Sequence, residues 1–183
     1  MPLGAKVRRL IELKRQPGGE EYPISEIART ASGLYREQKI SQRVGELTAA
    51  GASQQEIERA VEAIRREPDV LARSYLSEIK DGKRPNPPFD KIVALSLFFG
   101  VTVDYFAVGP AITEATKRAE DEVELYALTQ QLASRLDTDS SGKGAELMGA
   151  LMRGGLKMDP QQLAGMFRLQ LAAMDQAHEE ETK

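Results

Sequence analysis

Residues with hydroxyl and basic side chains are concentrated in and beside one short segment, residues 74–80. Leu76 and Ile79 are three positions apart, so they share one helical face and can anchor a short helix to a core. The side chains expected to point outward are Arg73, Ser74, Ser77, Glu78 and Lys80. Hydroxyl groups and cations bind phosphate oxygens, and a helix presented by its N-terminal end can enter the major groove of DNA.

The turn after this segment adds two adjacent cations. Asp81-Gly82 is typical of a turn, and Lys83 and Arg84 follow it directly. We expect these two side chains to hold a phosphate strand beside the helix. Tyr75 has two interpretations that the sequence leaves open. It either stacks on or hydrogen-bonds to the DNA backbone, or it packs into the domain.

The elements that must position this segment are all predicted to be helices, because apolar residues recur at helical spacing and no long β-branched alternation occurs. In the first part, helices are expected before Pro17-Gly18-Gly19, from Pro23 to a break at Gly33, and over residues 34–50, 53–66, 74–80, 92–99 and 103–107. Ser53 to Glu56 has the form of a capping box, and Thr102 suits an N-cap. Helices at about 113–137, at 145–153 and from Asp159-Pro160 follow.

Gly109-Pro110 is the expected domain boundary, and the two sides of it differ in charge. Residues 1–110 carry 17 Lys and Arg against 15 Asp and Glu, whereas residues 111–183 carry 8 against 13. This asymmetry, within a net charge of −3, fits a binding half joined to an acidic assembly half.

Catalysis and metal binding have little support in the sequence, so we expect no enzyme, no cofactor and no metal. The chain has no Cys and a single histidine, His178, so thiolate sites are excluded and no serine has a histidine partner suited to activate it. No stretch approaches the roughly 18 apolar residues of a membrane span, and the start lacks the apolar core of a signal peptide. A cytoplasmic protein without membrane contact is expected.

The segment from Ser74 to Arg84 resembles the recognition helix and following turn of a Cro/CI-type (XRE family) helix-turn-helix domain. The sequence after it, with Asn86-Pro87, Phe98-Phe99-Gly100-Val101 and Asp104-Tyr105-Phe106, is similar to the EspR-type branch of nucleoid-associated and regulatory proteins. The strong part of the resemblance covers about residues 53–107. It implies an N-terminal helix-turn-helix domain at 1–109 and a C-terminal helical dimerisation domain at 110–183, in a protein of the cytoplasmic nucleoid.

The chain departs from this family pattern by an extra helical segment within residues 23–72. Either Ile24–Ala31 is the positioning helix before the turn, and residues 33–72 are an insertion, or Ser53–Arg66 is that helix and residues 23–50 are the addition. The capping box and the proximity of 53–66 to the turn favour the second alternative.

The expected function is sequence-specific binding of double-stranded DNA by a homodimeric transcription regulator. Two half-sites read together add affinity that one small recognition helix lacks. The dimer is expected to form through an apolar stripe on the last helix, made of Leu163, Met166, Phe167, Leu171 and Met174. The alternative is an adaptor that retains the helix-turn-helix scaffold, lacks DNA binding and acts on other proteins in the manner of an antitoxin or a sigma factor. The sequence leaves the operator, any small-molecule effector and higher assembly undetermined.

Overall fold

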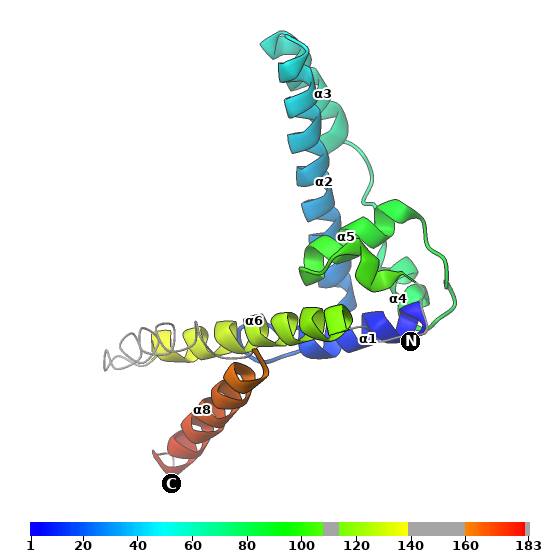
Figure 1. Ribbon diagram of the computed structural model, residues 1–183. Helices are drawn as coiled ribbons and strands as arrows, with labels where there is room; N and C mark the ends of the chain where they lie inside the picture. The colour runs from blue at the N-terminus through cyan, green and yellow to red at the C-terminus, as the bar shows by residue number, and fades with distance from the viewer. Residues whose placement is uncertain (108–113, 139–159, 182–183) are drawn as a thin grey trace. The chain divides into compact units, whose positions relative to one another are not determined.

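The computed structural model describes residues 1–107, 114–138 and 160–181, and these residues form helices and no strand (Figure 1). The prediction of an all-α fold is confirmed for this part of the chain. The helices are α1 (Leu3–Leu13), α2 (Ile24–Ala49), α3 (Gln54–Arg65), α4 (Arg73–Lys80), α5 (Phe89–Phe99), the 3-10 turn η1 (Val103–Phe106), α6 (Glu114–Thr138) and α8 (Pro160–Glu181).

The chain divides into two compact units. The N-terminal unit consists of Pro2–Val7 and Pro23–Val108, and the C-terminal unit consists of Met1, Arg8–Tyr22 and Gly109–Lys183. The second half of α1 thus groups with the C-terminal unit, whereas the sequence predicts one domain over residues 1–109. Within the C-terminal unit, Arg9 forms an ion pair with Glu120 at 3.5 Å, and the Lys14 ammonium lies over the ring of Tyr126.

The N-terminal unit contains a single long helix where two helices were expected. α2 continues through Gly33, so the predicted break at this residue is wrong. A glycine inside a helix costs only about 1 kcal/mol relative to alanine. The buried side chains just before it, from Ile27 to Ser32, pack the helix into the core and offset that cost.

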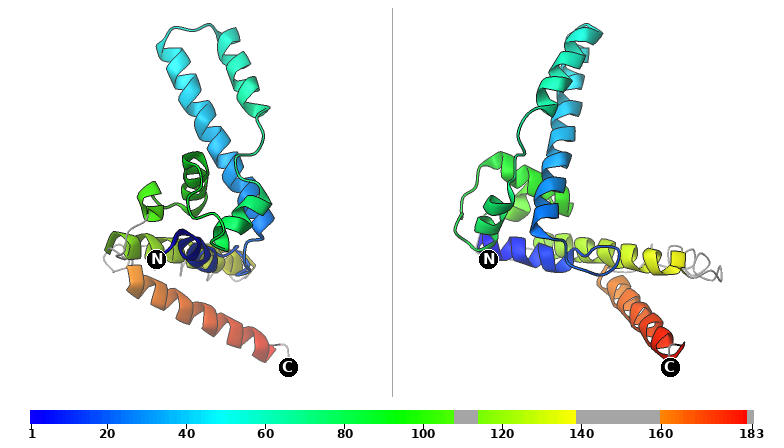
Figure 2. Two further views of the ribbon diagram at one scale, coloured as in Figure 1. Left: turned by 90° about the vertical axis from the view of Figure 1, so that its right-hand side faces the viewer. Right: turned by 180° about the vertical axis from the view of Figure 1, so that it is seen from behind.

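α2 and α3 lie side by side as a helical hairpin (Figure 2). Gly51 in the connection has a φ of +73°, which a residue with a Cβ rarely adopts. The predicted capping box is confirmed: the Ser53 hydroxyl accepts from the Glu56 amide, and the Glu56 carboxylate accepts from the Ser53 amide at 2.8 Å. It lies at the end of the hairpin that is remote from α4 (Figure 1).

The helix that supports α4 is α2, not α3. α2 packs against α3, α4 and α5, and the residues of α2 that are buried all lie between Ile27 and Ser32. α3 buries only Ile64, within its pairing with α2. The sequence-based preference for Ser53–Arg66 as the supporting helix is therefore wrong. A capping box predicts where a helix begins, but it does not predict which helix packs against α4. That depends on which side chains are buried between the helices.

The segment between α3 and α4 is fastened to α2 by side chains. The Ser32 hydroxyl, almost fully buried, accepts from the Leu71 amide at 3.1 Å and lies 3.4 Å from the Leu71 carbonyl oxygen. Arg36 forms an ion pair with Asp69 at 2.8 Å, and Lys39 forms one with Glu67 at 2.6 Å. These contacts fix where α4 begins.

α5 and η1 complete the core of this unit. Phe98, Phe99, Tyr105 and Phe106 are buried in this core, and Gly100 ends α5 with a φ of +74°. The short segment after Thr102 is a 3-10 turn rather than an α-helix, and the Thr102 side chain makes no cap hydrogen bond. Lys6 of α1 holds this turn, because its ammonium donates to the carbonyl oxygens of Tyr105 and Ala107 at 2.7 and 2.8 Å.

The C-terminal unit is organised around the packing of α6 against α8. Its core is formed by Leu128, Leu132, Ala164, Phe167 and Leu171, with Leu125, Leu163 and Met174 packed against it. Arg168 of α8 forms an ion pair with Glu124 of α6, and Gln161 donates to Asp121 at 3.2 Å.

Several expectations concern residues outside those described. The boundary at Gly109-Pro110, the helix over 145–153 and the start signal at Asp159 all lie there. Within 1–107, 114–138 and 160–181, none of the helices combines the length and apolar character needed to cross a membrane.

Candidate nucleic-acid interface

α4 has one polar face, because its apolar side chains are buried in the core on the opposite side. Leu76 and Ile79 are completely buried, and on an eight-residue helix this leaves Ser74, Ser77 and Glu78 on the opposite side. Arg73 and Ser74 are exposed at the start of the helix. The face is thus made of hydroxyls, one carboxylate and a terminal guanidinium.

The N-terminus of α4 is suited to an anion. Its N-cap residue is Ala72, which makes no side-chain cap hydrogen bond, and the first turn contains no acidic residue. The first amides of a helix lack partners within the helix and carry a partial positive charge. Arg73 adds a full charge at the same end. A phosphate oxygen is the natural partner for this combination.

The turn after α4 is built on Gly82, whose φ is +76°. The Gly82 amide donates to Ile79 and the Lys83 amide donates to the carbonyl of Glu78 at 2.8 Å, so the chain reverses tightly over the last turn of α4. Gly4 of α1 supports this turn from below: a Cβ on Gly4 would lie 2.7 Å from the Ile79 carbonyl oxygen. This role of Gly4 could not be predicted from the sequence, because it depends on the packing of α1 against a turn that lies far along the chain.

Arg84 lies across the outward side of α4 instead of extending away from it. Its Nε donates to the Glu78 carboxylate at 2.7 Å, and its guanidinium carbon lies 5.4 Å from the centre of the Tyr75 ring. The Glu78 carboxylate raises the pKa of Arg84 further above its ordinary value, so the guanidinium stays charged at every relevant pH.

Tyr75 is half-buried and lies between two cations. Besides Arg84, the ammonium of Lys91 lies 4.8 Å from the ring centre. Lys91 also donates to the Val70 carbonyl at 2.7 Å, which ties the start of α5 to the segment before α4. Sequence reasoning missed Lys91, because its place beside α4 depends on tertiary packing.

The remaining cations that are predicted to contact DNA differ in whether they form an ion pair within the protein. In the part of the chain that the structure describes, Arg73 and Lys83 form no ion pair, whereas Lys80 lies 3.8 Å from the Asp81 carboxylate. Lys83 is exposed just beyond the C-terminal end of α4, so the two unpaired cations bracket the helix. Both can approach a phosphate without first breaking a salt bridge.

The five residues predicted for dimerisation lie mainly in the core of the C-terminal unit. Phe167 and Leu171 are buried against α6, Leu163 and Met174 are partly buried there, and Met166 is 40% exposed. α6 of the same chain therefore covers most of the stripe. Among the described residues of α8, the large apolar side chains that remain exposed are Met166 and Leu169, the latter at 74%.

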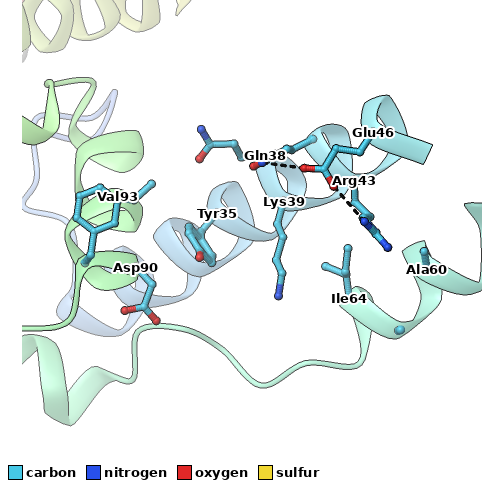
Figure 3. Close-up of a pocket in the computed structure, with 12 residues that line it drawn as sticks. Tyr35, Gln38, Lys39, Arg43, Glu46, Ala60, Ile64, Asp90 and Val93 are labelled. Carbon is cyan, nitrogen blue, oxygen red and sulfur yellow. Dashed lines mark hydrogen bonds and ion pairs between the residues drawn. The ribbon is translucent and has the colours of Figure 1, made fainter. Parts of the chain in front are cut away.

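A hollow of the N-terminal unit lies between the α2–α3 hairpin and α5 (Figure 3). It measures about 730 Å³. One wall is the polar stripe of α2 that includes Tyr35, Lys39 and Arg43, and the facing wall is Ala60, Ala63 and Ile64 of α3. Phe89 at the start of α5 lies at this hollow and is 71% exposed.

No protein-family model matches the chain, and neither a curated protein nor a solved structure is significantly similar to it. Within the described ranges, no three His, Cys, Asp or Glu side chains converge as a metal site. Any functional assignment therefore depends on the chemistry of the surfaces described above.

Proposed function

We propose that the chain is a helix-turn-helix regulator that binds double-stranded DNA by placing α4 in the major groove. The observation that carries this proposal is the polar face of α4, bracketed by the unpaired cations Arg73 and Lys83. Cations at both ends of a short helix are placed to contact phosphates on the two sides of a groove while the hydroxyls between them face base edges. The resemblance of residues 74–84 to a recognition helix and turn supports the same function.

We further propose that two copies act together through the C-terminal unit. One eight-residue recognition helix offers little affinity, and paired half-sites about one helical turn apart supply the rest. Because α6 already covers Phe167 and Leu171, the large apolar side chains that the described part of α8 leaves exposed for a second copy are Met166 and Leu169, which are three residues apart. Replacing Leu169 by Glu is expected to convert a dimer to a monomer, as measured by light scattering coupled to size exclusion.

The DNA-binding proposal is tested by titrating the full chain into a fluorescent mixed-sequence duplex over a range of salt concentrations. Wild type is expected to bind at low salt with a steep salt dependence. The double variant Arg73→Ala/Lys83→Ala is expected to reduce the slope of log K against log salt by about two units, because about one unit is lost for each phosphate contact.

The matched control is Arg59→Ala/Arg65→Ala, which removes the same charge from exposed positions of α3. The control is expected to keep the wild-type slope. An equal loss of slope in both double variants would show that net charge alone matters, and absence of binding by wild type at low salt would refute the proposal.

The hollow beside α5 favours a second candidate, the protein-interaction adaptor. An exposed Phe89 next to small residues on α3 offers an apolar surface that α4 does not need. If this candidate is right, Phe89→Ser abolishes co-purification of a specific partner while Arg73→Ala/Lys83→Ala has no effect on it, and the purified chain ignores DNA.

A further inference from the structure

The Arg84 side chain does not extend away from α4, as would be expected of a side chain that contacts the DNA backbone beside the helix. The guanidinium is folded back over Tyr75 and Glu78, two residues three apart on α4. Glu78 belongs to the outward face opposite Leu76 and Ile79. Arg84 is therefore placed along the face that α4 would turn toward base edges.

The contact with Glu78 uses only Nε of the Arg84 guanidinium. The Glu78 carboxylate accepts from Nε of Arg84, and within the described residues neither terminal nitrogen of this guanidinium, Nη1 or Nη2, has a hydrogen-bond partner. The planar fork is held on one edge by the carboxylate and supported by the Tyr75 ring. Such a fork presents two parallel N–H groups in a fixed geometry.

Two acceptors match this fork, a guanine edge and a phosphate, and the charge of Glu78 distinguishes them. The carboxylate lies 2.7 Å from the guanidinium, so a phosphate bound to the same fork would come close to a second negative charge. The O6 and N7 atoms of guanine are uncharged acceptors and do not suffer this repulsion. Glu78 thus favours the base edge over the backbone.

We propose that Arg84 reads a guanine in the major groove and that Glu78 and Tyr75 are positioning residues for it. This inference rests on the proposed DNA binding and changes the role expected of Arg84 from the sequence. Phosphate contacts then fall to Arg73 and Lys83, and the sequence preference of the protein depends on Arg84.

The test is selection of binding sites from random duplexes by the full chain, with wild type and Arg84→Lys compared. Lysine keeps the charge and the phosphate attraction but lacks the fork. Wild type is expected to select a fixed guanine in each half-site. Arg84→Lys is expected to keep the salt slope and to lose the guanine preference about 10- to 100-fold, since a bidentate contact discriminates by that order.

Two further measurements separate base reading from a structural effect. Replacing the selected guanine by 7-deazaguanine, which lacks N7, is expected to weaken binding by wild type about tenfold and binding by Arg84→Lys by a smaller factor, because lysine lacks the planar fork. Glu78→Ala is expected to lower the guanine preference, and Glu78→Gln to restore part of it, because the amide oxygen still accepts from Nε.

Selection of the same guanine by Arg84→Lys with equal preference would overturn the inference and leave DNA binding intact. Insensitivity of wild type to 7-deazaguanine would have the same meaning. Failure of wild type to bind any duplex at low salt would overturn the proposed function together with the inference, so the two failures are distinguishable.

Discussion

A Cβ atom on Gly4 would lie 2.7 Å from the carbonyl oxygen of Ile79, at the last turn of α4. It would also lie 2.9 Å from the Lys80 carbonyl oxygen and 3.0 Å from the Gly82 amide. All three neighbours are backbone atoms, so they cannot rotate away as a flexible side chain would. α1 can approach the turn that carries Lys83 and Arg84 only because residue 4 is a glycine.

Gly4→Ala is therefore expected to destabilise the N-terminal unit by about 1–3 kcal/mol, the usual cost of overpacking. Weaker DNA binding should accompany the loss, because the turn after α4 is displaced. Gly45→Ala is the control: Gly45 is exposed in α2 with nothing within 4 Å of its Cβ position. That change should stabilise by about 0.5–1 kcal/mol. Urea denaturation followed by circular dichroism measures the free energy of unfolding of both variants. Equal changes in the two variants would contradict the close approach of Gly4 to the turn after α4.

Ser32→Ala is expected to loosen the segment that leads into α4. The buried Ser32 hydroxyl forms hydrogen bonds with both the amide and the carbonyl of Leu71. Removing the hydroxyl leaves these two groups without a partner, which is expected to lower the free energy of unfolding by about 1–3 kcal/mol. Ser41→Ala, an exposed serine on the same helix, should have little effect. Amide hydrogen exchange at Leu71 reads the contact directly. Unchanged protection there in Ser32→Ala would show that the hydrogen bond is not formed.

The sequence predicts individual helices better than it predicts which helices pack against one another. The capping box at Ser53 and the turn at Gly82 follow from local chemistry, which neighbouring residues alone decide. The continuity of α2 through Gly33 could not be predicted, because buried contacts formed with distant residues outweigh a weak local preference. Lys6, which resembles an ordinary surface cation in sequence, is buried on the carbonyls of η1.

The candidate site shows the same limit. The outward residues of α4 followed from the positions of Leu76 and Ile79, and the structure keeps Ser74 and Arg73 exposed. The convergence of Arg84 on Tyr75 and Glu78 depends on the tight turn at Gly82, and Lys91 joins them through α5. No spacing rule relates residue 75 to residue 91.

The capping box of α3 predicts a stability that falls in acid. Hydrogen bonds from the Ser53 side chain and amide lower the pKa of Glu56 below its ordinary value of 4.5. A carboxyl whose pKa is lowered by folding stabilises the folded state above its ordinary pKa, and that contribution is lost as pH falls through the folded pKa. The stability difference between wild type and Glu56→Ala should therefore be present at pH 7 and shrink as the pH falls below the ordinary pKa of 4.5.

The cause of this shift is tested by NMR titration of the Glu56 carboxyl. In Ser53→Ala the side-chain hydrogen bond to Glu56 is absent, so the pKa of Glu56 should rise toward its ordinary value. An unchanged titration in Ser53→Ala would mean that the capping box is not formed in solution.

The C-terminal unit offers a test that separates its internal packing from a dimer contact. Phe167 is 5% exposed and packs with Leu128 and Leu132, whereas Leu169, two residues further on, is 74% exposed. Phe167→Ala should destabilise the α6–α8 pair by about 3–5 kcal/mol, because it removes a buried aromatic ring and leaves a cavity. Leu169→Ala should change monomer stability by less than about 0.5 kcal/mol, as exposed substitutions usually do.

Hydrogen exchange over residues 161–174, at concentrations where the chain is monomeric, measures this difference. Faster exchange in Phe167→Ala with wild-type exchange in Leu169→Ala is the result expected from intrachain packing. If instead protection over α8 in wild type itself disappears on dilution to monomer, α8 is buried by a second copy and not by α6 of its own chain. That outcome would restore Phe167 and Leu171 to the dimer interface.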